Sequence, residues 1–231
     1  MKPVWHWSRR VLAVLVLLAI AWQGWYFGWV VWWKFVNPAT TSFMSLRLDE
    51  LREKDPRAEL KMQWAPYERV SNHLKRAVVA AEDARFSEHE GFDWEGIQKA
   101  LEKNQKKGRI VAGGSTITQQ LAKNLFLSAS KTPWRKAQEA VITLMLETVM
   151  DKRRILEIYL NVVEWGPGIF GAEAAARHYY GLSAAQLSAE QAARLAVLLP
   201  NPRKFGRLPN SAYLAARSQV ILGRMGAAEL P

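Results

Sequence analysis

The first 35 residues are dominated by an unbroken run of uncharged, mostly apolar side chains. No charged residue lies between Arg10 and Lys34, and the stretch 11–33 reaches the roughly 20 residues that a helix needs to cross the hydrocarbon of a bilayer. It predicts a transmembrane anchor. A cleaved signal peptide is the alternative, since Ala-Ile-Ala at 19–21 is an acceptable cleavage site. Cleavage there would leave the very apolar segment 22–35 as a loose terminus, which favours the anchor.

After the anchor, the pattern changes twice. Residues 34–66 are polar, mixed in charge and interrupted by prolines, which is typical of a linker and leaves room for one short helix. From 67 to 231, apolar positions recur with a helical period, and no long alternating run indicates strands. Two stripes predict helices with an apolar face toward the core: Leu74, Ala77, Val78 and Ala81, and then Ala137, Ala140, Val141, Leu144, Met145 and Thr148.

Local signals mark three helix starts in this region. Thr116 with Gln119 forms a capping box after two glycines, and Ser188 with Gln191 forms another ahead of a helix that Pro200 would end. Pro133 suits the first turn of a third helix. The sequence therefore predicts a mainly α protein with residues 1–10 in the cytoplasm, a transmembrane helix at 11–33, a linker at 34–66 and one domain at 67–231.

Composition and charge narrow the partners. The formal charge of +11 calls for an anionic partner such as nucleic acid, lipid headgroups or a phosphate-bearing substrate. Eleven tryptophans point to a membrane interface, and the absence of cysteine excludes disulfides, thiol nucleophiles and thiolate metal sites. Because Lys2, Arg9 and Arg10 precede the anchor, the positive-inside rule places the N-terminus in the cytoplasm and the domain outside the cytoplasmic membrane.

One glutamate continues a buried stripe. Leu74, Val78 and Glu82 are successive i+4 positions, so an acid falls where an apolar residue is expected. Burial and the negative end of a helix both disfavour the carboxylate and raise its pKa toward the range useful for a general base. A glutamate that turns to solvent at the helix end is the alternative.

Cations gather at two predicted helix starts. The start at Thr116 offers unpaired N–H groups to an anion, and Lys123 lies on the same polar face as Gln119. Arg135 and Lys136 fall in a first helical turn, where the helix dipole repels cations. A bound anion would explain them, while a solvated surface pair is the competing explanation.

Four ordered segments resemble the motifs of the peptidoglycan glycosyltransferases of family 51, and a chain this short resembles the monofunctional biosynthetic type. The resemblance covers about 68–202, and its segments are Glu82-Asp-Ala-Arg-Phe-Ser-Glu-His-Glu-Gly-Phe-Asp93, Gly113-Gly-Ser-Thr-Ile-Thr-Gln-Gln-Leu-Ala-Lys-Asn124, Arg135-Lys-Ala-Gln-Glu139 and Ile155-Leu-Glu-Ile-Tyr-Leu-Asn161. Four blocks in order are a specific signal.

The resemblance implies a lysozyme-like helical fold with a large lobe and a smaller, membrane-apposed lobe. It implies Glu82 as catalytic base and Glu139 as the second functional acid. The residues expected to bind substrate and pyrophosphate are Asp83, Phe86, His89, Ser115, Thr116, Gln119, Gln120, Lys123, Lys131, Arg135 and Lys136. Lys131 stands where relatives carry arginine, so it keeps the charge but loses the bidentate geometry. We expect His89 and Gly91 to order the turn after the first helix.

The implied reaction joins two lipid-linked disaccharides, with inversion at the anomeric carbon and release of undecaprenyl pyrophosphate. Expected partners are lipid II, lipid-linked glycan, the membrane, and proteins of cell-wall synthesis or division, but no nucleic acid. No cofactor is required; Mg²⁺ or another divalent cation could accompany the pyrophosphate, although the sequence has no metal-ligand cluster. Two alternatives stay open: a lysozyme-like lytic transglycosylase that cleaves glycan, and a non-catalytic basic membrane scaffold.

Overall fold

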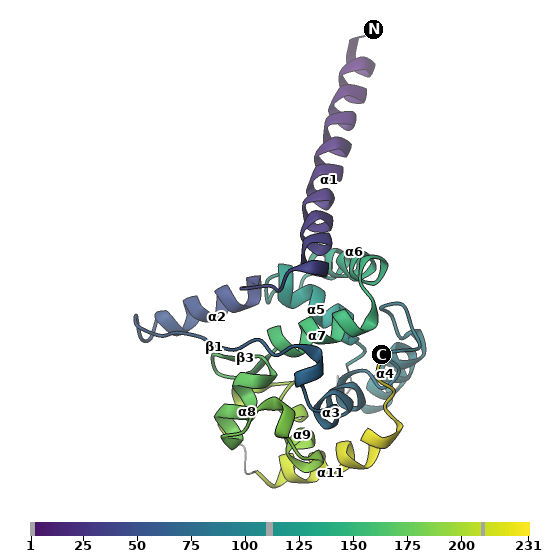
Figure 1. The fold of residues 1–231 in the computed structure, drawn as a ribbon. Coiled ribbons are helices and arrows are strands. Elements are labelled where there is room, and N and C mark those ends of the chain that lie inside the picture. The colour runs from purple at the N-terminus through teal and green to yellow at the C-terminus, as the bar shows by residue number, and fades with distance from the viewer. Residues whose placement is uncertain (1–2, 110–112, 209–210) are drawn as a thin grey trace. The chain divides into compact units, whose positions relative to one another are not determined.

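The computed structural model describes residues 3–109, 113–208 and 211–231 (Figure 1). The chain divides into two units, residues 1–37 and 38–231. Most described residues are helical, so the prediction of a mainly α protein is confirmed. The predicted division into a large and a smaller lobe stays a prediction.

The first unit is one helix, α1 (Pro3–Phe35). Within it, Trp7–Phe35 is the single helix in the described part of the chain that is long and apolar enough to cross a membrane, with a mean hydropathy of 1.8. This confirms the prediction of an N-terminal helix with these properties. Aromatic rings contact one another along it, and the centroids of Trp25 and Trp29 lie 5.9 Å apart in an edge-to-face arrangement.

The second unit is built mainly from helices of 8 to 17 residues. Its α-helices are α2 (Ser42–Arg52), α3 (Asn72–Glu82), α4 (Trp94–Lys107), α5 (Ile117–Phe126), α6 (Pro133–Val149), α7 (Lys152–Val162), α8 (Ala172–Tyr180), α9 (Ala189–Ala196), α10 (Pro202–Phe205) and α11 (Ala212–Arg224). Its strands are β1 (Lys61–Met62), β2 (Glu164–Gly166) and β3 (Ile169–Phe170). Three short 3-10 helices lie at Tyr67–Arg69, Ala184–Gln186 and Met225–Ala227.

Two groups of helices form the core of the second unit. One contains α3, α9 and α11, and the other contains α5 with α2, α6 and α7 packed on it (Figure 1). Leu74, Ala77 and Val78 of α3 are buried, as the first apolar stripe predicted. The local start signals are also confirmed, because Thr116 and Ser188 form the predicted capping boxes. The helix after Ser188 ends at Ala196, before Pro200.

A small sheet joins segments that are far apart in the sequence. Its strand order is β1-β3-β2, with β1 parallel and β2 antiparallel to β3. The segment 34–66, which the sequence analysis read as a linker with one short helix, carries both α2 and β1. No strand was predicted there, because two residues are too short to show an alternating pattern.

The second predicted stripe is wrong about which face of α6 is buried. Ile142 and Leu146 are buried, together with the polar residues Gln138, Glu139 and Thr143. By contrast, Val141 and Leu144 of the predicted stripe are 39% and 54% exposed. The polar face can be buried because its groups are paired: Thr143 Oγ1 donates to the Glu139 carbonyl at 2.8 Å. A satisfied polar group has little desolvation cost left.

Candidate active site

Glu82 is the last residue of α3 and is held by a neutral partner. Gln120 Nε2 of α5 donates to Glu82 Oε2 at 2.7 Å, and the Tyr159 hydroxyl of α7 donates to Gln120 Oε1 at 3.0 Å. Burial raises the pKa of Glu82, the neighbouring Asp83 carboxylate adds to the rise, and the Gln120 hydrogen bond and Lys123 oppose it. A partly buried carboxyl with a raised pKa and an amide partner can accept a proton.

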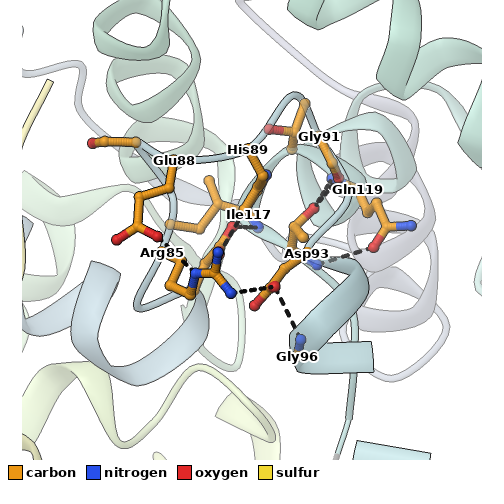
Figure 2. A network of polar contacts seen from close by, with 12 residues as sticks. Arg85, Glu88, His89, Gly91, Asp93, Gly96, Ile117 and Gln119 are labelled. Atoms are coloured by element: carbon orange, nitrogen blue, oxygen red, sulfur yellow. Dashed lines mark hydrogen bonds and ion pairs between the residues drawn. The ribbon is translucent and has the colours of Figure 1, made fainter. Parts of the chain in front are cut away.

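Asp83 fixes the chain that follows Glu82. Its Oδ2 accepts from the backbone N–H of Ile117 at 3.0 Å, and its Oδ1 lies 2.9 Å from His89 Nε2. The α3 end is therefore tied directly to the α5 start. Figure 2 shows the surrounding loop, in which Arg85 contacts Glu88. His89 orders this turn, as expected, through its contact with Asp83.

The N-terminus of α5 already has its acceptors. Thr116 Oγ1 accepts from the Gln119 N–H at 3.2 Å and donates to the Gly91 carbonyl at 2.7 Å, while Gln119 Oε1 accepts from the Thr116 N–H at 3.0 Å (Figure 2). The Asp83 carboxylate accepts from the Ile117 N–H in the same turn. The sequence predicted that N–H groups here would be unpaired and would bind an external anion, but those of Thr116, Ile117 and Gln119 already have acceptors within the protein. The anion at this helix start is therefore the protein's own Asp83.

Beyond Gln120, a cluster of cations surrounds a second acid. Arg135 and Lys136 in the first turn of α6 both pair with Glu139, which is 3% exposed. Lys123 lies one turn after Gln120 on α5. Burial lowers the pKa of Lys123, the Glu139 carboxylate raises it, and the charge of Arg135 lowers it again. Lys123 on α5 therefore interacts electrostatically with the charged residues in the first turns of α6.

Arg135 retains an unused donor. Among the described residues, its buried Nε has no hydrogen-bond partner, while its Nη1 binds Glu139. Lys136 Nζ also lies 3.4 Å from Ser115 Oγ. An unpaired buried guanidinium N–H next to two lysines is costly unless an anion completes it. The arrangement can therefore hold an anionic group between α5 and α6.

Two hollows flank the Glu82–Gln120 pair. Gln120 and Lys123 line a cleft of about 270 Å³, and Glu82 lines a hollow of about 350 Å³ together with Ser115 and Thr116. Because Glu82 and Gln120 are hydrogen-bonded to each other, they stand between the two hollows. Such an arrangement can bring one group from each side to the same carboxyl.

Two other expected site residues differ in exposure: Phe86 is buried and Lys131 is exposed. Phe86 is fully buried, with the Lys152 ammonium 4.6 Å from its ring centroid, so it packs the loop after Glu82. Lys131 is exposed in the segment before α6. The structure thus brings Glu82 and Gln120 together, with Lys123 one helical turn after Gln120, whereas Phe86 is a packing residue.

Several cleft residues were missed by the sequence analysis. Arg47 of α2 donates through Nε to Glu164 Oε2 at 3.2 Å, and the ring of Phe43 lies 4.5 Å from the Arg47 guanidinium and 5.7 Å from the Lys123 ammonium. Asn201 and Arg203 also line this cleft. The one available signal was Glu164, an acid within the apolar run 162–165. No local pattern joins Arg47 to a residue 117 positions away.

Glu164 is buried beside these cations. Burial raises its pKa, whereas Arg47 and the Gly168 N–H lower it.

In the part of the chain that the structure describes, no group of three His, Cys, Asp or Glu side chains could hold a metal ion. A role for Mg²⁺ stays a prediction of the sequence.

Comparison with known proteins gives consistent results. Residues 49–226 match the family model described as transglycosylase. The chain is 62% identical over 231 residues to the biosynthetic peptidoglycan transglycosylase of Dechloromonas aromatica (strain RCB) and 63% identical over 231 residues to that of Azoarcus sp. (strain BH72), covering all of each protein. It is 59% identical over 225 residues to the protein of the same name from Laribacter hongkongensis (strain HLHK9), covering 97% of this chain and 99% of the relative.

Proposed function

Because the chain belongs to the transglycosylase family and is a peptidoglycan glycosyltransferase, we propose that it polymerises lipid II with Glu82 as the general base. The observation that carries this proposal is the hydrogen bond to Glu82, a carboxyl of raised pKa, from Gln120, which lies one helical turn before Lys123 on α5. A base and a cation then lie close to the same glutamine, Gln120. Glycosyl transfer from a pyrophosphate needs both.

The proposed step transfers one proton and exchanges one bond. The 4-hydroxyl of one lipid II gives its proton to Glu82 as its oxygen bonds to the anomeric carbon of the growing strand. The bond from that carbon to the pyrophosphate oxygen breaks, and undecaprenyl pyrophosphate leaves with the electron pair. Since no covalent sugar intermediate forms, the anomeric configuration inverts.

Lys123, Arg135 and Lys136 act on the leaving group. Pyrophosphate needs no strong acid to leave, but its developing charge is stabilised by cations already in position. The unpaired Nε of Arg135 supports this assignment, because it is a buried donor without an acceptor among the described residues. Glu139 is a positioning residue in this scheme, since it binds Arg135 and Lys136 rather than the substrate.

The membrane supplies the substrate. A polyprenyl-linked sugar stays in the bilayer, so the active unit must work at its surface, and α1 supplies a single-pass anchor. The exposed apolar face of α6 supports contact with lipid, because Trp134 is 77% and Leu144 54% exposed. We place the N-terminus in the cytoplasm and the second unit outside the cytoplasmic membrane on the positive-inside rule.

The deciding experiment is incubation of the purified full chain with lipid II. Polymer that a muramidase degrades, with release of undecaprenyl pyrophosphate, supports the proposal. Release of soluble muropeptides from isolated sacculi, without polymer from lipid II, would instead select a lytic transglycosylase. Strong DNA binding with neither product would select the basic membrane scaffold.

The topology has its own test. Protease added to spheroplasts should digest the chain after Lys34, and carbonate washing should leave the protein in the membrane fraction, because a spanning helix is not held by charge. Protection from external protease would contradict the proposed orientation. A mature N-terminus at Trp22 would replace the anchor with a cleaved signal.

A further inference from the structure

The cleft that contains Lys123 adjoins a second, larger hollow. The second hollow has a volume of about 650 Å³ and shares Arg47, Asn201 and Arg203 with the cleft. Lys204 and Arg207 line it without lining the cleft. The two hollows therefore adjoin, and Lys204 and Arg207 lie on the side that Lys123 does not line. We call the second hollow, lined by Arg47, Asn201, Arg203, Lys204, Arg207 and Leu208, the basic groove.

The basic groove carries an excess of positive charge. Glu50 pairs with both Arg47 and Arg203, at 2.7 and 3.1 Å, and Arg47 also binds Glu164. Four cations in the groove, which include Lys204 and Arg207, thus face two carboxylates, leaving a formal charge of +2.

The two inner cations are fixed by these ion pairs, while the two outer ones are not. Among the described residues, neither Lys204 nor Arg207 takes part in an ion pair, and both are exposed. Their donors remain open to an anionic ligand from outside the protein. The groove therefore has a rigid inner end and an outer end with two available cations.

From the adjacency of the two hollows and this excess of positive charge, we infer that the basic groove binds the carboxylates of peptides on the glycan strand being elongated. The inference rests on the proposed function, since a strand whose linked end reacts beside Lys123 must leave along a path that starts there. Peptidoglycan strands carry short peptides with free carboxylates, which Arg and Lys bind by charge-assisted hydrogen bonds. The first disaccharide occupies the cleft, so only a longer strand reaches Lys204 and Arg207.

The groove fits a peptide carboxylate better than a lipid headgroup. Its cations line a hollow that adjoins the cleft, whereas the exposed apolar face suited to lipid lies on α6. Exposed ion pairs are weak one by one, and each changes an affinity by about 1.4- to 5-fold. Two of them would hold a strand long enough to favour further additions without blocking its movement.

The test compares Lys204→Gln/Arg207→Gln with Arg69→Gln/Arg76→Gln. The control removes the same charge from exposed arginines that line neither hollow. In detergent at low salt, we expect the groove variant to join the first two lipid II molecules at the wild-type rate. Its strands should be shorter by about 2- to 30-fold, and the difference should shrink as salt rises. The control should make strands of wild-type length.

A change in the substrate identifies the ligand. With lipid II whose peptide carboxylates are amidated, the wild type should make strands as short as those of the groove variant, and the variant should show no further loss. If amidation shortened the glycan strands of the wild type and of the variant equally, the inference would be overturned, because the groove would not be binding those carboxylates. A defect that appears only in vesicles containing phosphatidylglycerol, and not in detergent, would assign the groove to lipid headgroups and overturn it as well.

The outcomes also separate this inference from the proposed function. If the wild type makes no polymer from lipid II, the proposed function fails. If the wild type makes polymer and the groove variant makes strands of the same length at low salt, only the present inference fails. Circular dichroism and thermal unfolding of both variants exclude a trivial loss of fold.

Discussion

Glu82 and Glu139 are two glutamates at one site with opposite partners. Glu82 ends α3 and accepts a hydrogen bond from the neutral amide of Gln120, whereas Glu139 lies within α6 with a cation on each of its oxygens. Burial raises the pKa of Glu82. The oxygens of Glu139 are occupied by Arg135 and Lys136.

The difference assigns different work to two residues of the same type. A carboxyl held by an amide can gain and lose a proton without breaking an ion pair, so Glu82 suits a base. A carboxylate between two cations orients them instead, because taking up a proton would break both pairs. The partner, more than the residue type or the burial, separates the two roles.

The largest expected effect is that of Glu82→Gln, which keeps the shape but removes the base. Turnover should fall by roughly 10² to 10⁴-fold. The pKa of Glu82 is higher in the folded protein than in the unfolded chain. As the pH rises above the unfolded value, ionisation of Glu82 therefore lowers the free energy of unfolding. The variant should therefore unfold at the same or a higher temperature than the wild type at pH 7. Retention of more than a tenth of the activity would show that another group is the base.

Lys123→Ala tests the cation that lies between the two acids. Loss of one transition-state contact to the pyrophosphate should cost roughly 2 to 4 kcal/mol, or about 30- to 1000-fold in kcat. Arg135→Ala should fall in the same range. Steady-state kinetics with lipid II distinguishes the alternatives, since a raised KM at unchanged kcat would mean that these residues bind substrate and transition state equally.

Glu139→Gln tests the second half of the comparison. Removing the charge that holds Arg135 and Lys136 should lower kcat by about tenfold, equivalent to roughly 1.4 kcal/mol of lost cation positioning. The acid limb of the pH profile should stay where it is in the wild type, because that limb belongs to Glu82. A displaced acid limb would show that Glu139 itself takes the substrate proton.

The smallest expected effect is a shift in pH dependence. Activity should fall as the pH drops through the raised pKa of Glu82, because the base must be ionised. The hydrogen bond from Gln120 lowers that pKa, so Gln120→Met should move the acid limb of kcat/KM to higher pH. A limb that moves downward, or stays fixed, would contradict the proposed role of this amide.

Local sequence signals determined where several helices begin and where a membrane helix lies. The capping boxes at Thr116 and Ser188 and the proline at Pro133 act within four residues, so the chain needs no tertiary contact to express them. The apolar run of α1 is similarly local. The stripe through Leu74 and Val78 predicted that Glu82 continues the buried face of α3. In the structure Leu74 and Val78 are buried and Glu82 is the last residue of that helix.

Tertiary structure decided the long-range partners of the charged groups and which helix faces are buried. The stripe on α6 misled because a helix can bury its polar face when Glu139 and Thr143 are paired there. Those pairs are local to α6, but only the packing against α5 decides which face is buried. The anion at the start of α5 proved to be Asp83, 34 residues earlier in the chain. Arg47 likewise meets Glu164 across 117 residues. Propensity and periodicity act over a few residues, whereas the partner of Glu82, the partner of Asp83 and the walls of the basic groove depend on contacts between distant segments that no local pattern encodes.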